Sequence, residues 1–247
     1  MKNKLLGKTL QVLETIAAST EPKSLKSIAA ELDMASGTLS RIISDLCEYG
    51  LIEKFGYHHV RSSLGMIRLG QDAMTNLSLP RIIPPIMRAH EKSADAHGAF
   101  AGVHHWKLVY LYHGGIFGVQ EKDAHLTAAP PPDSILRSRL AAAILGTQYD
   151  DAKLQTLLSG RSASPSELAG AAFFLENCRQ VRANGYVAHR EFGRGWSVNF
   201  PVRCDAQVYG VSLFGQDAEN CNLERMIFET SLLASRLTSA LDERSRR

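Results

Sequence analysis

The sequence predicts an α+β fold in two parts, a small helical head that ends in a β-ribbon and a larger domain of mixed helices and strands. Apolar residues recur at helical spacing through the first 50 residues, and a strand, a turn and a second strand follow them. Prolines interrupt the helical pattern between residues 80 and 85. Beyond residue 97, strands and helices mix without strict alternation, which is typical of α+β domains.

Three short helices are expected in the head. The first follows the apolar positions of residues 6–17. Ser24 can cap the second helix and Ser36 the third, because a serine hydroxyl accepts a hydrogen bond from a free N–H of the first helical turn. Gly50 is expected to end the third helix, and residues 51–62 are then predicted to form the two-stranded ribbon.

The prolines between residues 80 and 85 set the predicted domain boundaries, because they are not expected inside one unbroken helix. We place the head at residues 1–70, a linker helix region at residues 71–96 and the second domain at residues 97–247. The second domain is expected to contain strands at 99–104 and 107–113, helices at 134–145, 151–158 and 165–184, strands at 186–190, 197–202 and 207–214, and a last helix at 223–241.

The composition is that of an ordinary globular protein. The chain has 247 residues, of which 45% are hydrophobic and 21% charged, and this excludes an intrinsically disordered chain. No apolar run is long enough for a signal peptide or a membrane span, so a cytoplasmic location without a membrane partner is expected. The four cysteines are widely spaced and include no Cys-x-x-Cys pair, which argues against a disulfide framework or a zinc knuckle.

The charge permits nucleic-acid binding without requiring it. The net charge is +3, and residues 1–75 carry nine Lys and Arg against eight Asp and Glu. A domain whose charge alone indicates nucleic-acid binding would carry more Lys and Arg residues, clustered in one patch. Charge alone therefore does not predict DNA binding.

The head meets the requirements of a winged helix-turn-helix, which needs a small residue where two helices cross and a second helix with a short polar outer face. Ala29 lies at the predicted crossing, and Arg41 on the outer face can make a bidentate contact to guanine. Arg61 on the ribbon can reach a phosphate or the minor groove, or it is merely solvated. The alternative is a three-helix bundle with a solvated polar face, which would have no reason for the short turn and the ribbon. The candidate DNA-contacting residues are Lys26, Ser36, Gly37, Thr38, Ser40, Arg41, Ser44 and Arg61.

Several segments resemble the isocitrate lyase regulator (IclR) family of bacterial transcription factors. In the head these are residues 24–32 (SLKSIAAEL), 37–43 (GTLSRII) and 46–53 (LCEYGLIE). In the second domain they include residues 179–186 (RQVRANGY) and 210–213 (GVSL). The resemblance extends over nearly the whole chain.

The resemblance implies a sequence-specific DNA-binding transcriptional regulator, acting as a repressor or an activator. It also implies a winged head that dimerises, a linker helix, and a GAF-like C-terminal domain that binds a small metabolite, often an organic or aromatic acid, and can build tetramers. The expected partners are then a double-stranded DNA operator with paired half-sites, a small-molecule effector, and further copies of the chain in a homodimer or homotetramer.

The resemblance also implies an effector pocket, and several of its positions depart from the family pattern. Arg139 and Leu140 stand where the family commonly has glycine and lysine, Ser197 replaces a common cysteine, and Phe214 a common serine. These departures predict an effector that differs from the usual small acids, or a pocket that senses nothing. The residues placed in the pocket by the resemblance are Arg137, Leu140, His189, Glu191, Ser197, Ser212 and Phe214.

The strand pattern adds Asn199 to this set. Ser197 and Asn199 share one face of a strand because they are two residues apart, and Ser212 lies on a neighbouring predicted strand. An unpaired buried polar group costs about 1–3 kcal/mol. The cluster therefore either forms hydrogen bonds internally or lines a small cavity that receives a polar ligand.

The sequence lacks several motifs that are typical of enzymes. There is no His-Glu-x-x-His, no Gly-x-Ser-x-Gly and no P-loop. His104 and His105 are adjacent and are expected to point to opposite faces of a strand, which argues against a metal site. No catalytic residue, metal or cofactor is therefore expected. The alternatives to a ligand-responsive regulator are a DNA-tethered dimeric scaffold without a ligand response and an enzyme on the C-terminal domain.

Overall fold

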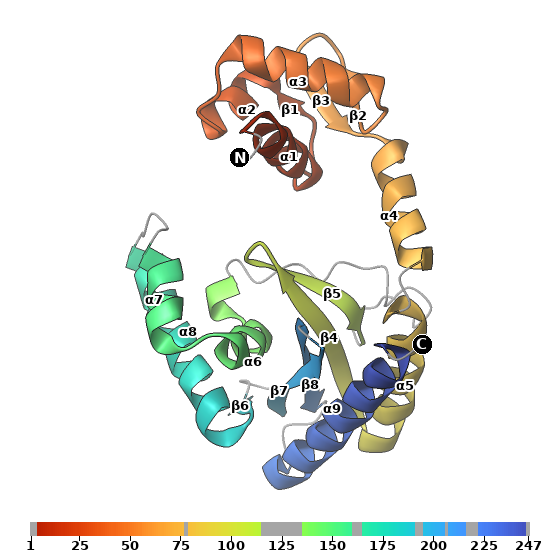
Figure 1. Ribbon diagram of the computed structural model, residues 1–247, viewed down its shortest axis with the longest axis vertical. Helices are drawn as coiled ribbons and strands as arrows, with labels where there is room; N and C mark the ends of the chain where they lie inside the picture. Colours follow the sequence, from red (N-terminus) through yellow and green to blue (C-terminus); the bar gives the residue numbers. More distant parts are fainter. Residues whose placement is uncertain are drawn as a thin grey trace. The chain divides into compact units, whose positions relative to one another are not determined.

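A computed structural model describes residues 4–76, 79–114, 135–159, 165–190, 195–205, 207–215 and 222–245 (Figure 1). The chain divides into two compact units, residues 1–77 and 78–247. The first unit is mainly helical with a small sheet, and the second combines a larger sheet with helices, so the predicted α+β class is confirmed. In the described ranges, none of the helices has both the length and the apolar character needed to cross a membrane.

The first unit contains the predicted three helices and ribbon, and a fourth helix follows the ribbon. Its elements are α1 (Lys4–Ala17), β1 (Lys23–Ser24), α2 (Leu25–Glu31), α3 (Ser36–Glu48), β2 (Ile52–Phe55), β3 (His59–Ser62) and α4 (Leu64–Asn76). The strands form an antiparallel sheet in the order β1-β3-β2. The sequence did not predict β1, because two residues are too few to show an alternating pattern.

One core holds the helices of the first unit against the ribbon. Val12 of α1 and Ile28 of α2 are fully buried, and they share this core with Ile52 of β2 and Val60 of β3. Because alternate residues of a strand point to opposite sides, this contact leaves the other face of the ribbon open to solvent. The ribbon is therefore anchored on one side and exposed on the other.

One of the two predicted helix caps is confirmed and the other is wrong. Ser24 caps α2, and its Oγ accepts a hydrogen bond from the N–H of Ser27 at 3.1 Å. In α3, however, Ser36 is the first helical residue, and the N-cap is Ala35, which has no capping side chain. The turn before α3 is fixed instead by Met34, whose side chain is buried in the core of the unit. Packing of the turn thus replaces the side-chain cap expected from the serine.

The second unit is built on a five-stranded antiparallel sheet in the order β5-β4-β8-β7-β6. The predicted order of strands and helices is confirmed. The elements are α5 (Leu79–Ala94), β4 (Ala96–His104), β5 (Lys107–His113), the 3-10 turn η2 (Ile135–Arg137), α6 (Arg139–Gln148), α7 (Asp151–Ser159), α8 (Pro165–Asn184), β6 (Val187–Arg190), β7 (Trp196–Cys204), β8 (Gln207–Gly215) and α9 (Leu223–Ser245).

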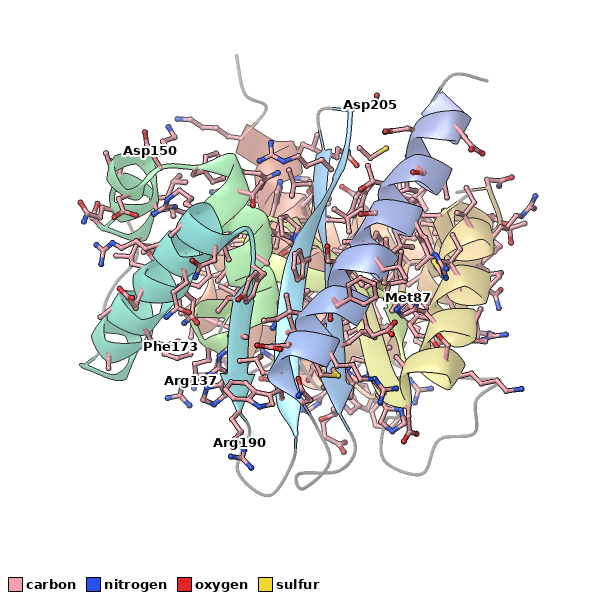
Figure 2. All side chains as sticks on the ribbon, turned by 90° about the horizontal axis from the view of Figure 1, so that it is seen from below. Met87, Arg137, Asp150, Phe173, Arg190 and Asp205 are labelled. Atoms are coloured by element: carbon pink, nitrogen blue, oxygen red, sulfur yellow. The ribbon has the colours of Figure 1, made fainter. Side chains whose placement is uncertain are left out.

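Helices cover both faces of this sheet. Side chains such as Phe100 and Val211 point to one face, where they share a core with α5 and α9, and Figure 2 shows Met87 between these two helices. On the other face, Ala99 and Ala101 pack against Leu140 of α6, which is backed by α8. Two layers of helices thus enclose the central sheet.

The helix break predicted at the prolines is wrong, because α5 runs through both Pro84 and Pro85. A proline removes one backbone hydrogen bond from a helix and is locally unfavourable. In α5 this disadvantage is outweighed by packing, since Pro84 is buried and Ile83 and Met87 are fully buried against the sheet and α9. The region predicted as a linker, residues 71–96, contains the end of α4 and all of α5, and α5 is part of the second core.

The expectation that His104 and His105 point to opposite faces of a strand is also wrong. His105 and Trp106 form the turn between β4 and β5, with φ angles of 47° and 62°. His105 therefore does not follow the alternation of a strand, and its imidazole stacks on that of His104, with ring centroids 4.2 Å apart. Among the residues that the structure describes, no group of three or more His, Cys, Asp or Glu could hold a metal ion.

Candidate functional sites

One side of α3 is open to solvent and carries small and polar residues. Gly37, Ser40, Arg41 and Ser44 are all exposed, and their spacing places them on one stripe of the helix. The opposite side of the helix is buried in the core of the unit. Arg41 is the single basic residue of α3, so it supplies the positive charge of this stripe.

The other residues predicted to contact DNA lie around this stripe. Ser36 is exposed at the start of α3, Thr38 is half-buried beside the stripe, and Lys26 is exposed on α2. Gly37 has unused space, because a Cβ built on it would meet no atom within 4 Å. Packing within the first unit therefore does not require a glycine at this position.

Arg61 lies on the exposed face of the ribbon, which we call the wing (β2, β3 and the turn between them). Its Nε donates to Oε1 of Glu53 at 2.6 Å, and its guanidinium lies 4.9 Å from the centre of the Phe55 ring. Glu53 and Arg61 are direct cross-strand partners. Arg61, which the sequence predicts to contact a phosphate, thus already has two partners within the wing.

In the second unit, five of the eight predicted pocket residues lie in two neighbouring cross-strand rows on the sheet face that α6 covers. Residues opposite each other in antiparallel strands share a face, so the strand register defines the rows. The Ser212 row runs from β5 to β6 through His113, Ala99, Ser212, Asn199 and Val187. The Phe214 row runs from β4 to β6 through His97, Phe214, Ser197 and His189.

Three polar side chains of these rows are buried, and part of their hydrogen bonding is internal. Ser197, Asn199 and Ser212 are 8%, 3% and 5% exposed. The amide nitrogen of Asn199 donates to the carbonyl of Val187 and to Oγ of Ser197, each at 3.4 Å. The amide nitrogen of Asn199 therefore has both of its acceptors within the sheet.

Helix α6 packs directly on the sheet beside the rows. Leu140 is buried, and a Cβ on Gly210 would lie only 2.7 Å from its Cδ1, so the glycine lets α6 approach β8 closely. Arg139 lies on another side of the helix, where its guanidinium is 5.0 Å from the ring centre of Phe173 on α8. The arginine that departs from the family pattern thus packs within the helical layer.

The structure contains an aromatic cluster that was not predicted from the sequence. The ring of Phe214 lies 5.7 Å from that of His97 and 5.8 Å from that of His113, and Tyr110 lies 5.2 Å from His113. Burial lowers the pKa of both histidines and raises the pKa of Tyr110. In the described part of the chain, Nδ1 of His113 is buried without a hydrogen-bond partner. The two imidazoles were missed because a sequence does not reveal that β4 lies between β5 and β8.

Two of the predicted pocket residues lie toward one end of the sheet. Arg137 and His189 are exposed, at the end of η2 and on the edge strand β6. Figure 2 shows Arg137 and Arg190 at the same end of the sheet, and Asp205 at the opposite end. The predicted residue Glu191 lies outside the described residues.

Comparisons with known proteins identify the fold. A family model of the winged helix DNA-binding domain matches residues 5–64. Among solved structures, an IclR family transcriptional regulator from Brucella abortus matches with a TM-score of 0.72 and 20% identity, over 94% of this chain and 92% of that one. This chain has the IclR-type fold. The first unit is accordingly the winged helix DNA-binding domain of that fold.

Further solved structures agree over nearly the whole chain. An IclR-type regulator from Silicibacter sp. TM1040 matches with a TM-score of 0.72 and 14% identity, over 96% of both chains. An IclR homologue from Microbacterium hydrocarbonoxydans, solved in complex with 4-hydroxybenzoate, matches with a TM-score of 0.64 and 15% identity, over 96% of this chain and 99% of that one. A search of curated protein sequences gave no match. The resemblance stated from the sequence is thus confirmed at the level of the fold.

Proposed function

We propose that this chain is a sequence-specific DNA-binding transcriptional regulator of the IclR type, whose DNA binding changes when a small molecule occupies the second unit. Two observations together carry the proposal. The winged helix domain exposes the α3 stripe, and the second unit buries Ser197, Asn199 and Ser212 on the sheet face that α6 covers. The α3 stripe lies outside the core of its own unit.

The α3 stripe supports DNA reading in the major groove. Glycine and serine side chains are short, so they allow the helix to approach base edges closely, and Arg41 can pair with guanine O6 and N7. Packing within the first unit does not require a glycine at position 37. A close approach of α3 to the DNA bases would explain the glycine. Ser36, Thr38, Ser44 and Lys26 are then placed to contact the flanking backbone.

The two polar rows support a ligand site. Buried polar groups on a face that is otherwise core are explained when they contact a ligand, and Nδ1 of His113 is such a group within the described residues. Leu140, Phe214, His97 and Ser212 would contact the ligand. The Microbacterium homologue binds 4-hydroxybenzoate. By analogy with it, we propose an organic or aromatic acid as the effector of this chain.

Exposed apolar side chains support self-association of the first unit. Helix α4 has no buried residue, and its Leu64 and Ile67 are 80% and 57% exposed. Leu6 and Leu10 of α1 are also about half exposed. Covering these side chains with a second copy gives a homodimer, and two-fold symmetry of the protein requires paired half-sites in the operator.

A scaffold that senses no ligand is the second candidate function, because the internal hydrogen bonds of Asn199 show that part of the polar cluster needs no ligand. The two candidates differ in one experiment. DNA fragments are first selected from a random library with the full chain, and organic and aromatic acids are then screened for a shift in Tm and for a change in affinity for the selected duplex. A ligand at a hundred times its Kd adds about 2.7 kcal/mol to stability.

The proposed regulator predicts an enriched duplex and at least one acid that shifts both Tm and DNA affinity. An enriched duplex without any active acid supports the scaffold. A library from which no sequence is enriched contradicts both candidates.

A further inference from the structure

The exposed face of the wing is organised around an ion pair. Because β2 and β3 are antiparallel, Glu53 lies opposite Arg61, and Phe55 lies opposite His59. All four side chains are exposed on this face, whereas Ile52 and Val60 of the same strands point into the core. The exposed face of the wing therefore carries one carboxylate directly beside its arginine.

The guanidinium of Arg61 is held in a defined position. Its Nε donates to Oε1 of Glu53 at 2.6 Å, and its Cζ lies over the Phe55 ring, 4.9 Å from the ring centre. Both partners come from β2, so they hold the guanidinium against the ribbon. About half of each charged side chain is still exposed, and such a pair exchanges partners readily in water.

Resting on the DNA binding proposed above, we propose that Glu53 is a specificity-determining residue of the wing. It neutralises Arg61, so that the wing adds little affinity for DNA of arbitrary sequence. Arg61 then exchanges Glu53 for a phosphate only when α3 is seated on its operator, because only a seated α3 holds a phosphate at a fixed place beside the wing.

The reason lies in how proteins bind arbitrary DNA. That affinity comes almost entirely from cations that neutralise phosphates and release counterions. The Glu53 carboxylate lies 2.6 Å from Nε of Arg61, so it offsets the positive charge that an approaching phosphate would meet. The carboxylate also repels the phosphate. A wing without Glu53 would bind phosphates of any sequence, and the protein would spend more time on non-specific sites.

The test uses the full chain, a random-sequence 20-bp duplex as the probe, and Kd measured between 50 and 200 mM KCl. The variants are Glu53→Gln, Arg61→Met and the double variant. The matched control is Asp72→Asn, which removes one negative charge from the same unit, where Asp72 pairs with Arg68 on α4. Circular dichroism checks that the exposed substitutions leave the fold intact.

We expect Glu53→Gln to tighten binding to the random duplex about 5- to 10-fold at 0.1 M salt, because one further phosphate contact steepens the slope of log K against log salt by about 0.9. The gain should disappear in the Arg61→Met background, and Asp72→Asn should change Kd less than twofold. An equal gain in Asp72→Asn, or a gain that persists without Arg61, overturns the proposal in favour of long-range charge. If neither wild type nor any variant binds duplex DNA, the proposed function itself fails, and this inference with it.

Discussion

The carboxylate of Glu91 on α5 accepts a hydrogen bond from the backbone N–H of Gly98 on β4 at 2.5 Å. The hydroxyl of Tyr112 on β5 donates to the same carboxylate. Gly98 and Tyr112 are the chain neighbours of His97 and His113, whose rings lie on the opposite face of the sheet. Glu91 therefore ties α5 to the two strands that carry the imidazoles of the candidate ligand site.

Replacing Glu91 by leucine should destabilise the second unit. The variant leaves the N–H of Gly98 without its acceptor, and an unpaired buried donor costs about 1–3 kcal/mol. Urea unfolding followed by tryptophan fluorescence measures this unit selectively, because both tryptophans, Trp106 and Trp196, lie in it. Tyr112→Phe is the control with a smaller expected effect, since it leaves the Gly98 bond in place. Wild-type stability in Glu91→Leu would show that the bond contributes nothing.

A second polar contact of α5 should make stability depend on pH. His90 is 1% exposed, and its Nε2 lies 3.1 Å from Oε2 of Glu229 on α9. Burial lowers the pKa of His90, although Glu229 partly opposes the shift. Below pH 6.5 the unfolded chain therefore takes up a proton that the folded chain does not, and folding stability falls as the pH falls.

The corresponding measurement is Tm between pH 7.5 and pH 5. We expect Tm to fall below pH 6.5 in the wild type and to fall less steeply in His90→Gln, whatever the absolute stability of that variant. An identical slope in the two proteins would assign the pH dependence to other groups.

The sequence predicted the elements that local patterns define. The apolar periodicity of α1 to α3 and the alternation in the ribbon were sufficient, because each of these elements buries one regular face. Ser36 and the prolines of α5 gave wrong expectations, because burial of Met34 and Ile83 outweighed the local preference. Packing of this kind depends on partners distant in sequence.

The candidate sites, like the fold, were predicted from the sequence only where a local pattern defines them. The α3 stripe was predictable, because one helix carries all of it. The Ser212 and Phe214 rows were found only in part, because a row contains one residue from each strand and depends on strand order. The pairing of Arg61 with Glu53 was missed for a similar reason, since it depends on the register of the ribbon.

Gly37 offers a variant in which stability and DNA binding should move in opposite directions. Gly37→Ala should stabilise the first unit by up to about 1 kcal/mol, because alanine favours the helix and the added Cβ meets no atom within 4 Å. It should weaken binding to the selected duplex, since the methyl group holds α3 away from the bases. Gly70→Ala on α4 is the matched control, with equally open space and no proposed DNA contact. Equal DNA affinity in the two variants would remove Gly37 from the reading surface.

Ser212→Leu should separate ligand response from DNA binding. Ser212 is buried in the middle of its row beside Asn199, so leucine fills the space proposed for the ligand. We expect near-normal affinity for the selected duplex and no change in that affinity on adding an acid that acts on the wild type. Ser235→Leu on the exposed side of α9 is the control and should respond normally. A normal response in Ser212→Leu would place the ligand elsewhere.

The most direct test of the account is the ratio of the Kd for a scrambled duplex to the Kd for the selected duplex, measured with the full chain at one salt concentration. We expect a ratio of at least about 10³, as specific DNA-binding proteins show. Arg41→Ala should weaken binding to the selected duplex by about 5- to 150-fold, whereas Arg225→Ala on α9 should leave it unchanged. Equal Kd values for the two duplexes in the wild type would contradict the proposal that this chain reads DNA sequence.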